Sequence, residues 1–119
     1  SGPHASAVEA GFYTTAVADE NLVHNLEHGY VVIWYNCSGL ESSACDDLQQ
    51  RIQGVMDRAG SAGVLGGSSK LIAVTRPTLD VQVAATSWGR MLKQPALDER
   101  ELLAFIKDFR NKAPEGTAS

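Results

Sequence analysis

Residues 30–35 are the feature that most restricts how this chain can fold. They read Tyr-Val-Val-Ile-Trp-Tyr, with β-branched or aromatic side chains throughout and no polar residue at alternate positions. A strand with one face in water shows that alternation, whereas a strand buried on both faces does not. We therefore predict that residues 30–35 are the central strand of a sheet that is covered on both sides.

Two helices are predicted from apolar residues that recur at steps of three and four. The first opens at Ser42 or Ser43 and ends at Gly60. The second begins at Asp98, and Glu101 three positions later completes a capping box. The apolar positions expected to cover the sheet are Leu48, Ile52, Val55, Met56 and Ala59 in the first helix, and Leu102, Leu103, Phe105, Ile106 and Phe109 in the second.

Residues 70–75 and 81–86 are the other two predicted strands of the core. The segment between them, Arg-Pro-Thr-Leu-Asp, suits a tight reversal, so we expect the two strands to pair as a hairpin with Arg76 in the turn. The first of them follows a helix and should pair in parallel with the 30–35 strand. The predicted fold is α+β, a small mixed sheet in the order strand, helix, strand, strand, helix. The second half of a thioredoxin-like domain has this order, as an analogy of shape only.

The first 29 residues are expected to form an arm and a short helix in front of this core. Residues 1–21 lack a sustained period, and we predict an extended arm with a short strand around Phe12 and Tyr13. Asp19 or Asn21 is expected to cap a helix that Gly29 ends. The 119 residues therefore make one domain, with a core at 30–112 and a tail at 113–119.

Composition excludes some partners. The formal net charge is −4 with both signs interspersed, so we expect no nucleic-acid partner. No run approaches the roughly 20 apolar residues that cross a bilayer. The first residue is not Met, so a signal peptide or membrane anchor upstream is compatible with the sequence. Exposed edge strands in so small a sheet are compatible with a homodimer.

Cys37 and Cys45 are the only cysteines, and seven residues separate them. A disulfide between them would close the loop after the central strand and would indicate an oxidising compartment. A reduced pair is the alternative. The spacing matches neither the Cys-x-x-Cys of dithiol exchange nor a familiar thiolate metal site.

Two of the three histidines lie in the run His24-Asn25-Leu26-Glu27-His28-Gly29, and the third is His4. On a helix, side chains four residues apart project from the same face. Imidazole nitrogen suits copper and zinc. We therefore predict a copper or zinc site with His4, His24 and His28 as ligands and Glu27 as a fourth ligand or an outer partner. The structural alternative is that these side chains cap helix carbonyls and bond to their neighbours.

The same run is compatible with two further functions. Read as His-x-x-Glu-His, it matches an inverted zinc-peptidase pattern in which Glu27 activates water and Glu99 or Glu101 supplies the third ligand. A chain of 119 residues leaves little room for a peptide-binding chamber. A histidine acting as acid or base without a metal, with Glu27 and His28 as the catalytic pair, is a related enzyme hypothesis. A protein-interaction module is the third.

Four blocks of sequence resemble a bacterial family catalogued as domain of unknown function 3105, across nearly the whole chain. They are Ser1-Gly2-Pro3-His4, Leu22-Val23-His24-Asn25-Leu26-Glu27-His28-Gly29 followed by Val31-Val32-Ile33, Arg76-Pro77, and Thr86-Ser87-Trp88-Gly89-Arg90. The resemblance implies an extracytoplasmic protein, commonly anchored by one N-terminal membrane helix. Tyr30 stands where members often carry glycine, and the two cysteines lie outside the family pattern.

The resemblance also implies roles for Trp88 and Arg90, which fall in a motif block. We expect them to wall the site or to hold Glu27 through a charged hydrogen bond. In the structural alternative, Trp88 fills the core and Arg90 is a solvated cation. The function expected from the whole sequence is a metal-binding domain in metal handling or an envelope accessory role, without substrate turnover.

Overall fold

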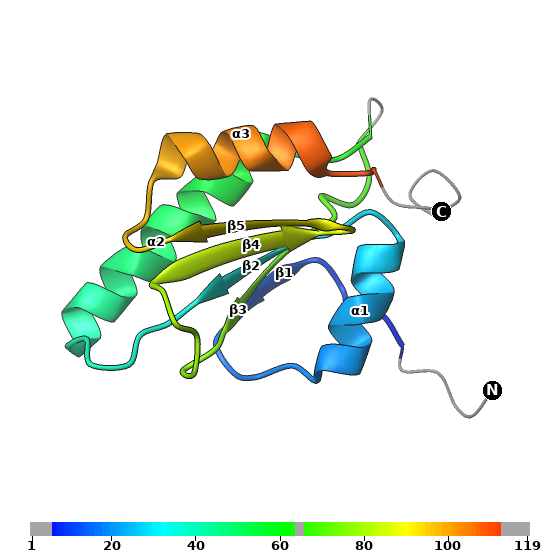
Figure 1. Cartoon of the computed structure of the whole chain (residues 1–119). Coiled ribbons are helices and arrows are strands. Elements are labelled where there is room, and N and C mark those ends of the chain that lie inside the picture. Colours follow the sequence, from blue (N-terminus) through cyan, green and yellow to red (C-terminus); the bar gives the residue numbers. More distant parts are fainter. Residues whose placement is uncertain (1–5, 64–65, 113–119) are drawn as a thin grey trace.

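The computed structural model describes residues 6–63 and 66–112. Within them, three helices pack on a mixed sheet, with α1 on one side and α2 and α3 on the other (Figure 1). In chain order the elements are β1 (Gly11–Tyr13), α1 (Asp19–Glu27), β2 (Val31–Tyr35), α2 (Ser42–Ala59), β3 (Leu71–Thr75), β4 (Val83–Ser87), β5 (Arg90–Gln94) and α3 (Glu99–Phe109). None of the helices within these two ranges is long and apolar enough to span a bilayer.

The five strands form one sheet in the order β1-β3-β2-β4-β5. β3 is parallel to both β1 and β2, whereas β4 is antiparallel to both β2 and β5. The middle of β2 fixes the register, because Val32 pairs with Ile72 of β3 on one side and with Thr86 of β4 on the other. The predicted α+β class and the parallel β2–β3 crossover are confirmed.

β2 is buried on both faces, as its sequence predicts. Val31, Val32 and Ile33 have no exposed surface. Successive side chains of a strand point to opposite faces. Val31 and Ile33 therefore join the core under α2 and α3, while Val32 packs with Leu22 of α1.

The predicted hairpin between β3 and β4 is wrong. β3 lies between β1 and β2, so both of its edges are occupied, and β4 pairs with the opposite edge of β2. The 76–82 connection crosses the end of β2, where Arg76 N donates to Tyr35 O at 2.8 Å and Asn36 N donates to Gln82 O at 2.9 Å. Local turn chemistry identifies a change of direction, but it does not identify the strand that the chain pairs with next.

The sequence prediction also lacks β5. It forms a hairpin with β4 whose two loop residues are Trp88 and Gly89, since Ser87 pairs with Arg90. Gly89 has φ of +76°, which glycine adopts without steric cost. β5 contains exposed polar residues because it is an edge strand, so the apolar pattern that reveals β2 is absent.

The predicted start of α1 needs a correction. Neither Asp19 nor Asn21 caps the helix; the residue before it is Ala18, and no side chain caps this end. Asp19 instead forms an ion pair with Arg76. Asn21 donates to the backbone oxygen of Ser6 at 2.6 Å. Asp19 and Asn21 could cap this helix in isolation, but in the folded protein they bond to residues that are distant in the sequence.

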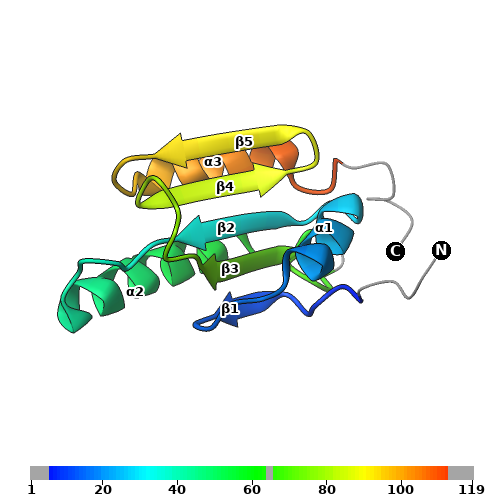
Figure 2. The same ribbon diagram turned by 60° about the horizontal axis from the view of Figure 1, so that its bottom comes forward.

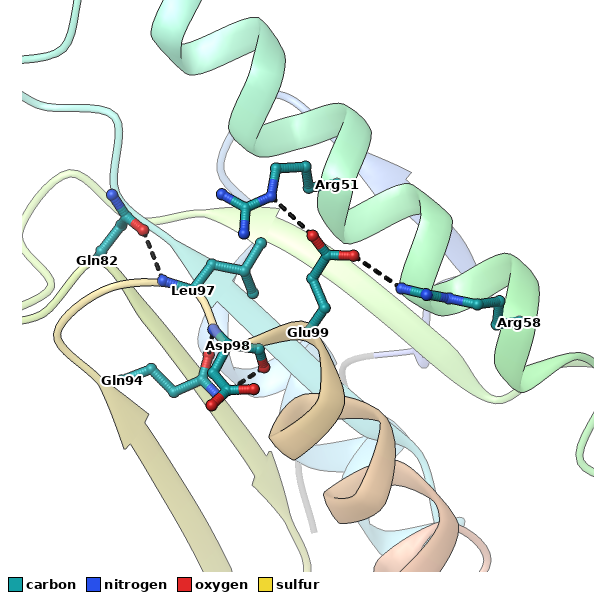
Figure 3. Close-up of polar contacts among 7 residues, drawn as sticks. All are labelled: Arg51, Arg58, Gln82, Gln94, Leu97, Asp98 and Glu99. Atoms are coloured by element: carbon teal, nitrogen blue, oxygen red, sulfur yellow. Dashed lines mark hydrogen bonds and ion pairs between the residues drawn. The ribbon is translucent and has the colours of Figure 1, made fainter.

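α3 begins with half of its predicted capping box. Asp98 Oδ1 accepts from the Glu101 amide at 3.0 Å, as expected. Gln94 takes the reciprocal half, because its side chain accepts from the Asp98 amide (Figure 3). It also donates to Glu101 Oε1. The end of β5 and the start of α3 are therefore joined by one glutamine.

Cys37 and Cys45 form a disulfide, with their α-carbons 5.4 Å apart. Cys37 follows β2, and Cys45 lies near the start of α2. The bond therefore ties the end of the central strand to the helix that covers it, and the predicted pairing is confirmed.

We predict that replacing both cysteines, as Cys37→Ser with Cys45→Ser, lowers the free energy of unfolding by about 2–3 kcal/mol. The reason is that the cross-link restricts the unfolded chain, by an amount that depends on the size of the closed loop. Urea unfolding of oxidised wild type and of the double variant measures the difference. Wild type under reducing conditions should match the variant, and an unchanged midpoint would contradict the prediction.

Candidate functional site

His24 and His28 bring their side-chain nitrogens together at the end of α1. Their Nε2 atoms lie 3.2 Å apart, and the ring centroids are 5.0 Å apart with an angle of 38° between the planes. Both side chains are partly buried. Two converging nitrogens at this separation can share one hydrogen bond, or both can face a single cation.

The hydrophobic side of α1 determines where this pair lies. Leu22 is buried against Val32, Ile72 and Val74, and Leu26 packs at the edge of the same cluster. Figure 2 shows α1 over the ends of β2 and β3. The helix ends at Glu27. His28 is its C-cap, whose amide donates to Asn25 O, and Gly29 follows with φ of +88°. His28 therefore lies at the end of the helix, one turn after His24.

Lys70 fixes the backbone at His28. Its Nζ donates to His28 O at 2.9 Å and to Asn111 Oδ1 at 3.0 Å. The last carbonyls of a helix lack partners within the helix, so this ammonium group satisfies one of them. Burial lowers the pKa of Lys70 from its ordinary value. Lys70 was not among the residues singled out from the sequence; a lysine directly before an apolar strand was its only signal.

Two asparagines hold the arm against α1. Asn25 is fully buried, and its side chain makes two hydrogen bonds to the backbone of Val8, at 3.0 and 2.9 Å. Asn21 bonds to Ser6 one turn earlier. His4, the third predicted ligand, lies outside the described residues. Asn25 was also missed as a contributor, although a polar residue on the buried face of a predicted helix is a recognisable signal.

Glu27 lies in the same turn of α1 and is partly buried. Among residues 6–63 and 66–112, no three histidine, cysteine or acidic side chains gather where they could hold a metal ion. The chemistry assembled within the described part of the chain is therefore the pair of imidazoles.

The two glutamates considered as a third peptidase ligand have other partners, at the N-terminal end of α3. Glu99 accepts from Arg51 Nε and from Arg58 Nη2, each at 2.8 Å (Figure 3). These two guanidinium groups lower the pKa of Glu99. Glu101 accepts from Gln94. Glu99 and Glu101 belong to the first turn of α3, whereas α1 lies near the opposite end of α3 (Figure 1).

Trp88 and Arg90 lie at the same end of the sheet as the end of α1. Extending the β2–β4 register beyond Val32 and Thr86 places Trp88 level with Tyr30. Trp88 is 43% exposed, so it does not fill the core. The Arg90 guanidinium lies over the ring of Phe109, 5.3 Å from its centroid. The observed partner of Arg90 is therefore an aromatic ring of α3.

Arg76 links the β3–β4 connection to the start of α1. It forms an ion pair with Asp19, and its guanidinium lies 4.3 Å from the ring centroid of Trp34. The sequence identified the turn that holds Arg76, whereas these two contacts are tertiary.

A groove of about 280 Å³ lies over β4 on the α1 side of the sheet. None of the described helices lies over this face of β4 and β5 (Figure 2). Trp34, Ala84 and Met91 contribute its apolar lining. The charged residues on its rim are paired, Arg76 with Asp19 and Lys93 with Asp80. The groove is therefore an apolar surface, and the candidate functional residues are the two histidines.

Comparison with known proteins assigns the chain to a family. The model of the family described as "Protein of unknown function (DUF3105)" matches residues 1–119, and the chain belongs to that family. The resemblance found in the four motif blocks is thereby confirmed. Neither the curated proteins nor the solved structures contain a match. The thioredoxin-like strand order therefore stays an analogy.

We predict that Lys70→Met lowers the free energy of unfolding by about 1–3 kcal/mol, because it leaves the His28 carbonyl and the Asn111 side chain without their charged donor. Lys93→Met is the matched control, since its ion pair with Asp80 is exposed. Such surface pairs contribute about 0–1 kcal/mol. Denaturant unfolding of the three proteins is the measurement, and equal losses in both variants would contradict the role assigned to Lys70.

Proposed function

We propose that this protein is an extracytoplasmic metal-binding domain that holds copper or zinc through His24 and His28. In this proposal His4 is the third ligand, and Glu27 is a fourth ligand or bonds to one of the imidazoles. The domain acts in metal handling, or as an accessory to a process of the cell envelope, without turning over a substrate. In the full-length protein a membrane anchor precedes the domain.

The 3.2 Å separation of the two Nε2 atoms is the observation that carries the proposal. Zinc binds imidazole nitrogen at about 2.0–2.1 Å in tetrahedral geometry, which puts two such nitrogens about 3.3 Å apart. The histidine pair therefore needs little rearrangement to become two ligands of one ion. Copper accepts the same donors and ranks above zinc in affinity for nitrogen sites of this kind.

His4 is proposed as the third ligand because the block Ser1-Gly2-Pro3-His4 is one of the four motif blocks that resemble the family. Imidazole nitrogen suits both zinc and copper.

The disulfide supports the location. Disulfides persist in oxidising compartments and are rare in the cytosol. The Cys37–Cys45 bond closes an exposed loop, so reductants in the surrounding solution would reach it. The extracytoplasmic character implied by the family resemblance agrees with this.

The peptidase alternative has lost support, because Glu99 and Glu101 are engaged at the far end of α3. No observation favours Glu27 with His28 as an acid–base pair, or an interaction module, over the metal site. Metal binding is also the function whose test separates these alternatives most directly.

We predict that tag-free protein binds one equivalent of Zn²⁺ or Cu²⁺, and that His24→Ala and His28→Ala each weaken binding by at least about 100-fold. The loss should exceed the 10–100-fold typical of residues that only orient a ligand. Titration against a chromophoric chelator measures both affinities. Asn36→Ala, at the far end of β2, is the control and should bind as wild type does.

Equal metal uptake by wild type and by both histidine variants would overturn the proposed function. If the histidine variants do lose binding, competition between Cu²⁺ and Zn²⁺ for the wild-type protein ranks the two metals. The pH is kept fixed because ligand deprotonation makes both affinities depend on pH.

A further inference from the structure

The outer edge of β5 carries backbone groups that face away from the sheet (Figure 2). Ser87 pairs with Arg90 across the two-residue turn, which makes them a hydrogen-bonded pair, and such pairs alternate along the two strands. The amides and carbonyls of Met91 and Lys93 therefore point away from β4. Among the described residues, none donates to or accepts from these four groups.

Met91 makes the same edge apolar. Its side chain is 63% exposed, more than any other large hydrophobic residue in the described part of the chain. Met91 and Lys93 both point to the α1 side of the sheet, where they line the groove. Leu92 points to the other side and packs at the margin of the core beneath α2 and α3. A strand edge of this kind is a template for pairing with another strand.

β5 is complementary to a second copy of itself in one register. With two β5 strands antiparallel about a two-fold axis at Leu92, Met91 of each copy lies opposite Lys93 of the other. All the outward amides and carbonyls then bond to one another. An axis at Met91 would instead bring Lys93 against Gly89 of the turn. An axis at Lys93 would bring Met91 against Pro95, which has no amide hydrogen. The Leu92 register is therefore the one that satisfies the whole edge.

The side chains fit this register as well. Leu92 meets Leu92 of the second copy, and Arg90 meets the neutral Gln94, so no like charges lie directly opposite. The aliphatic stem of Lys93 covers the exposed Met91 of the second copy, while its ammonium group keeps the ion pair with Asp80. The pairing thus buries the apolar residue and leaves no charge without a partner at the axis.

We propose that two copies of this protein associate through β5, antiparallel about an axis at Leu92, so that one continuous sheet runs through both. Each copy contributes one short strand, Arg90–Gln94, to the contact. The interface is therefore at the small end of the range for specific complexes, and we expect a dissociation constant of about 1–100 µM. This association is separate from the proposed metal site, whose histidines lie at the end of α1.

The register is tested by two opposite charges at position 91. Met91→Lys places a lysine opposite Lys93 twice in each dimer, whereas Met91→Glu places a carboxylate there. In sedimentation equilibrium of tag-free, metal-free protein, the Glu variant should dimerise at least about 10-fold more tightly than the Lys variant. Net charge alone predicts the reverse order, because the chain carries −4 and a further glutamate adds to the repulsion. Equal dissociation constants, or that reverse order, would overturn the proposal.

Met91→Pro tests the backbone bonds. Proline removes the outward amide hydrogen and leaves the bonds to β4 intact, since edge strands tolerate proline at such positions. Met91→Ala is the matched control, because it also removes the methionine side chain but keeps the amide. Met91→Ala should dimerise within about 10-fold of wild type. Met91→Pro should stay monomeric to about 1 mM, and equal association of the two variants would contradict pairing through β5.

Wild type itself should pass from monomer to dimer between about 1 µM and 1 mM. A wild type that stays monomeric throughout this range overturns the proposal and leaves the edge to an extended segment of another protein. Should Met91→Pro not fold, the comparison of Met91→Lys with Met91→Glu decides, because both substitutions are at an exposed position.

Discussion

Burial of β2 on both of its faces is the constraint on which the rest of the structure depends. Val31, Val32 and Ile33 are completely inaccessible to solvent. Each such side chain contributes about 1.5–3 kcal/mol when it is buried, so no arrangement that exposes one face can compete. A layer is needed on each side, and α1 supplies one while α2 and α3 supply the other. The two edges of β2 also need partners, which are β3 and β4.

Cations from neighbouring segments complete the C-terminal ends of α2 and α1. Arg110 donates to the carbonyl oxygens of Ala59, Gly60 and Ser69 at 2.8–3.1 Å, and Lys70 donates to that of His28 at 2.9 Å. Burial lowers the pKa of both residues. The ends of α2 and α1 are therefore completed by Arg110, which follows α3, and by Lys70, which precedes β3.

The histidine pair is a product of this arrangement. Its two nitrogens converge because His24 and His28 lie four residues apart at the end of α1. Gly29 then turns the chain into β2, and Lys70 holds the His28 carbonyl. The packing of α1 against β2 therefore sets the position of the two histidines of the proposed metal site. The family is described without an activity. The distance between the two imidazoles supports the proposal of metal binding, which can be measured.

Much of the fold was predictable from local pattern. The apolar run identified β2 as central, the three- and four-residue periodicity identified α2 and α3, and Asp98 caps α3 as expected, because each of these signals depends on neighbours along the chain. The spacing of the cysteines was compatible both with a disulfide and with a reduced pair. The motif itself placed His24 and His28 on one face of a helix.

Tertiary structure alone decided the remainder. β4 pairs with β2 and not with β3, because both edges of β3 are occupied. β5 escaped notice because an edge strand with one exposed face lacks an apolar run. Asn25 and Lys70 find their partners 17 and 42 residues away along the chain. The sequence by itself determined the helices and the strands other than β5, and it determined which residues carry the candidate chemistry. Which strands meet, and which side chains close the ends of the helices, depended on long-range packing, because hydrogen bonds between distant residues leave no periodic trace in the sequence.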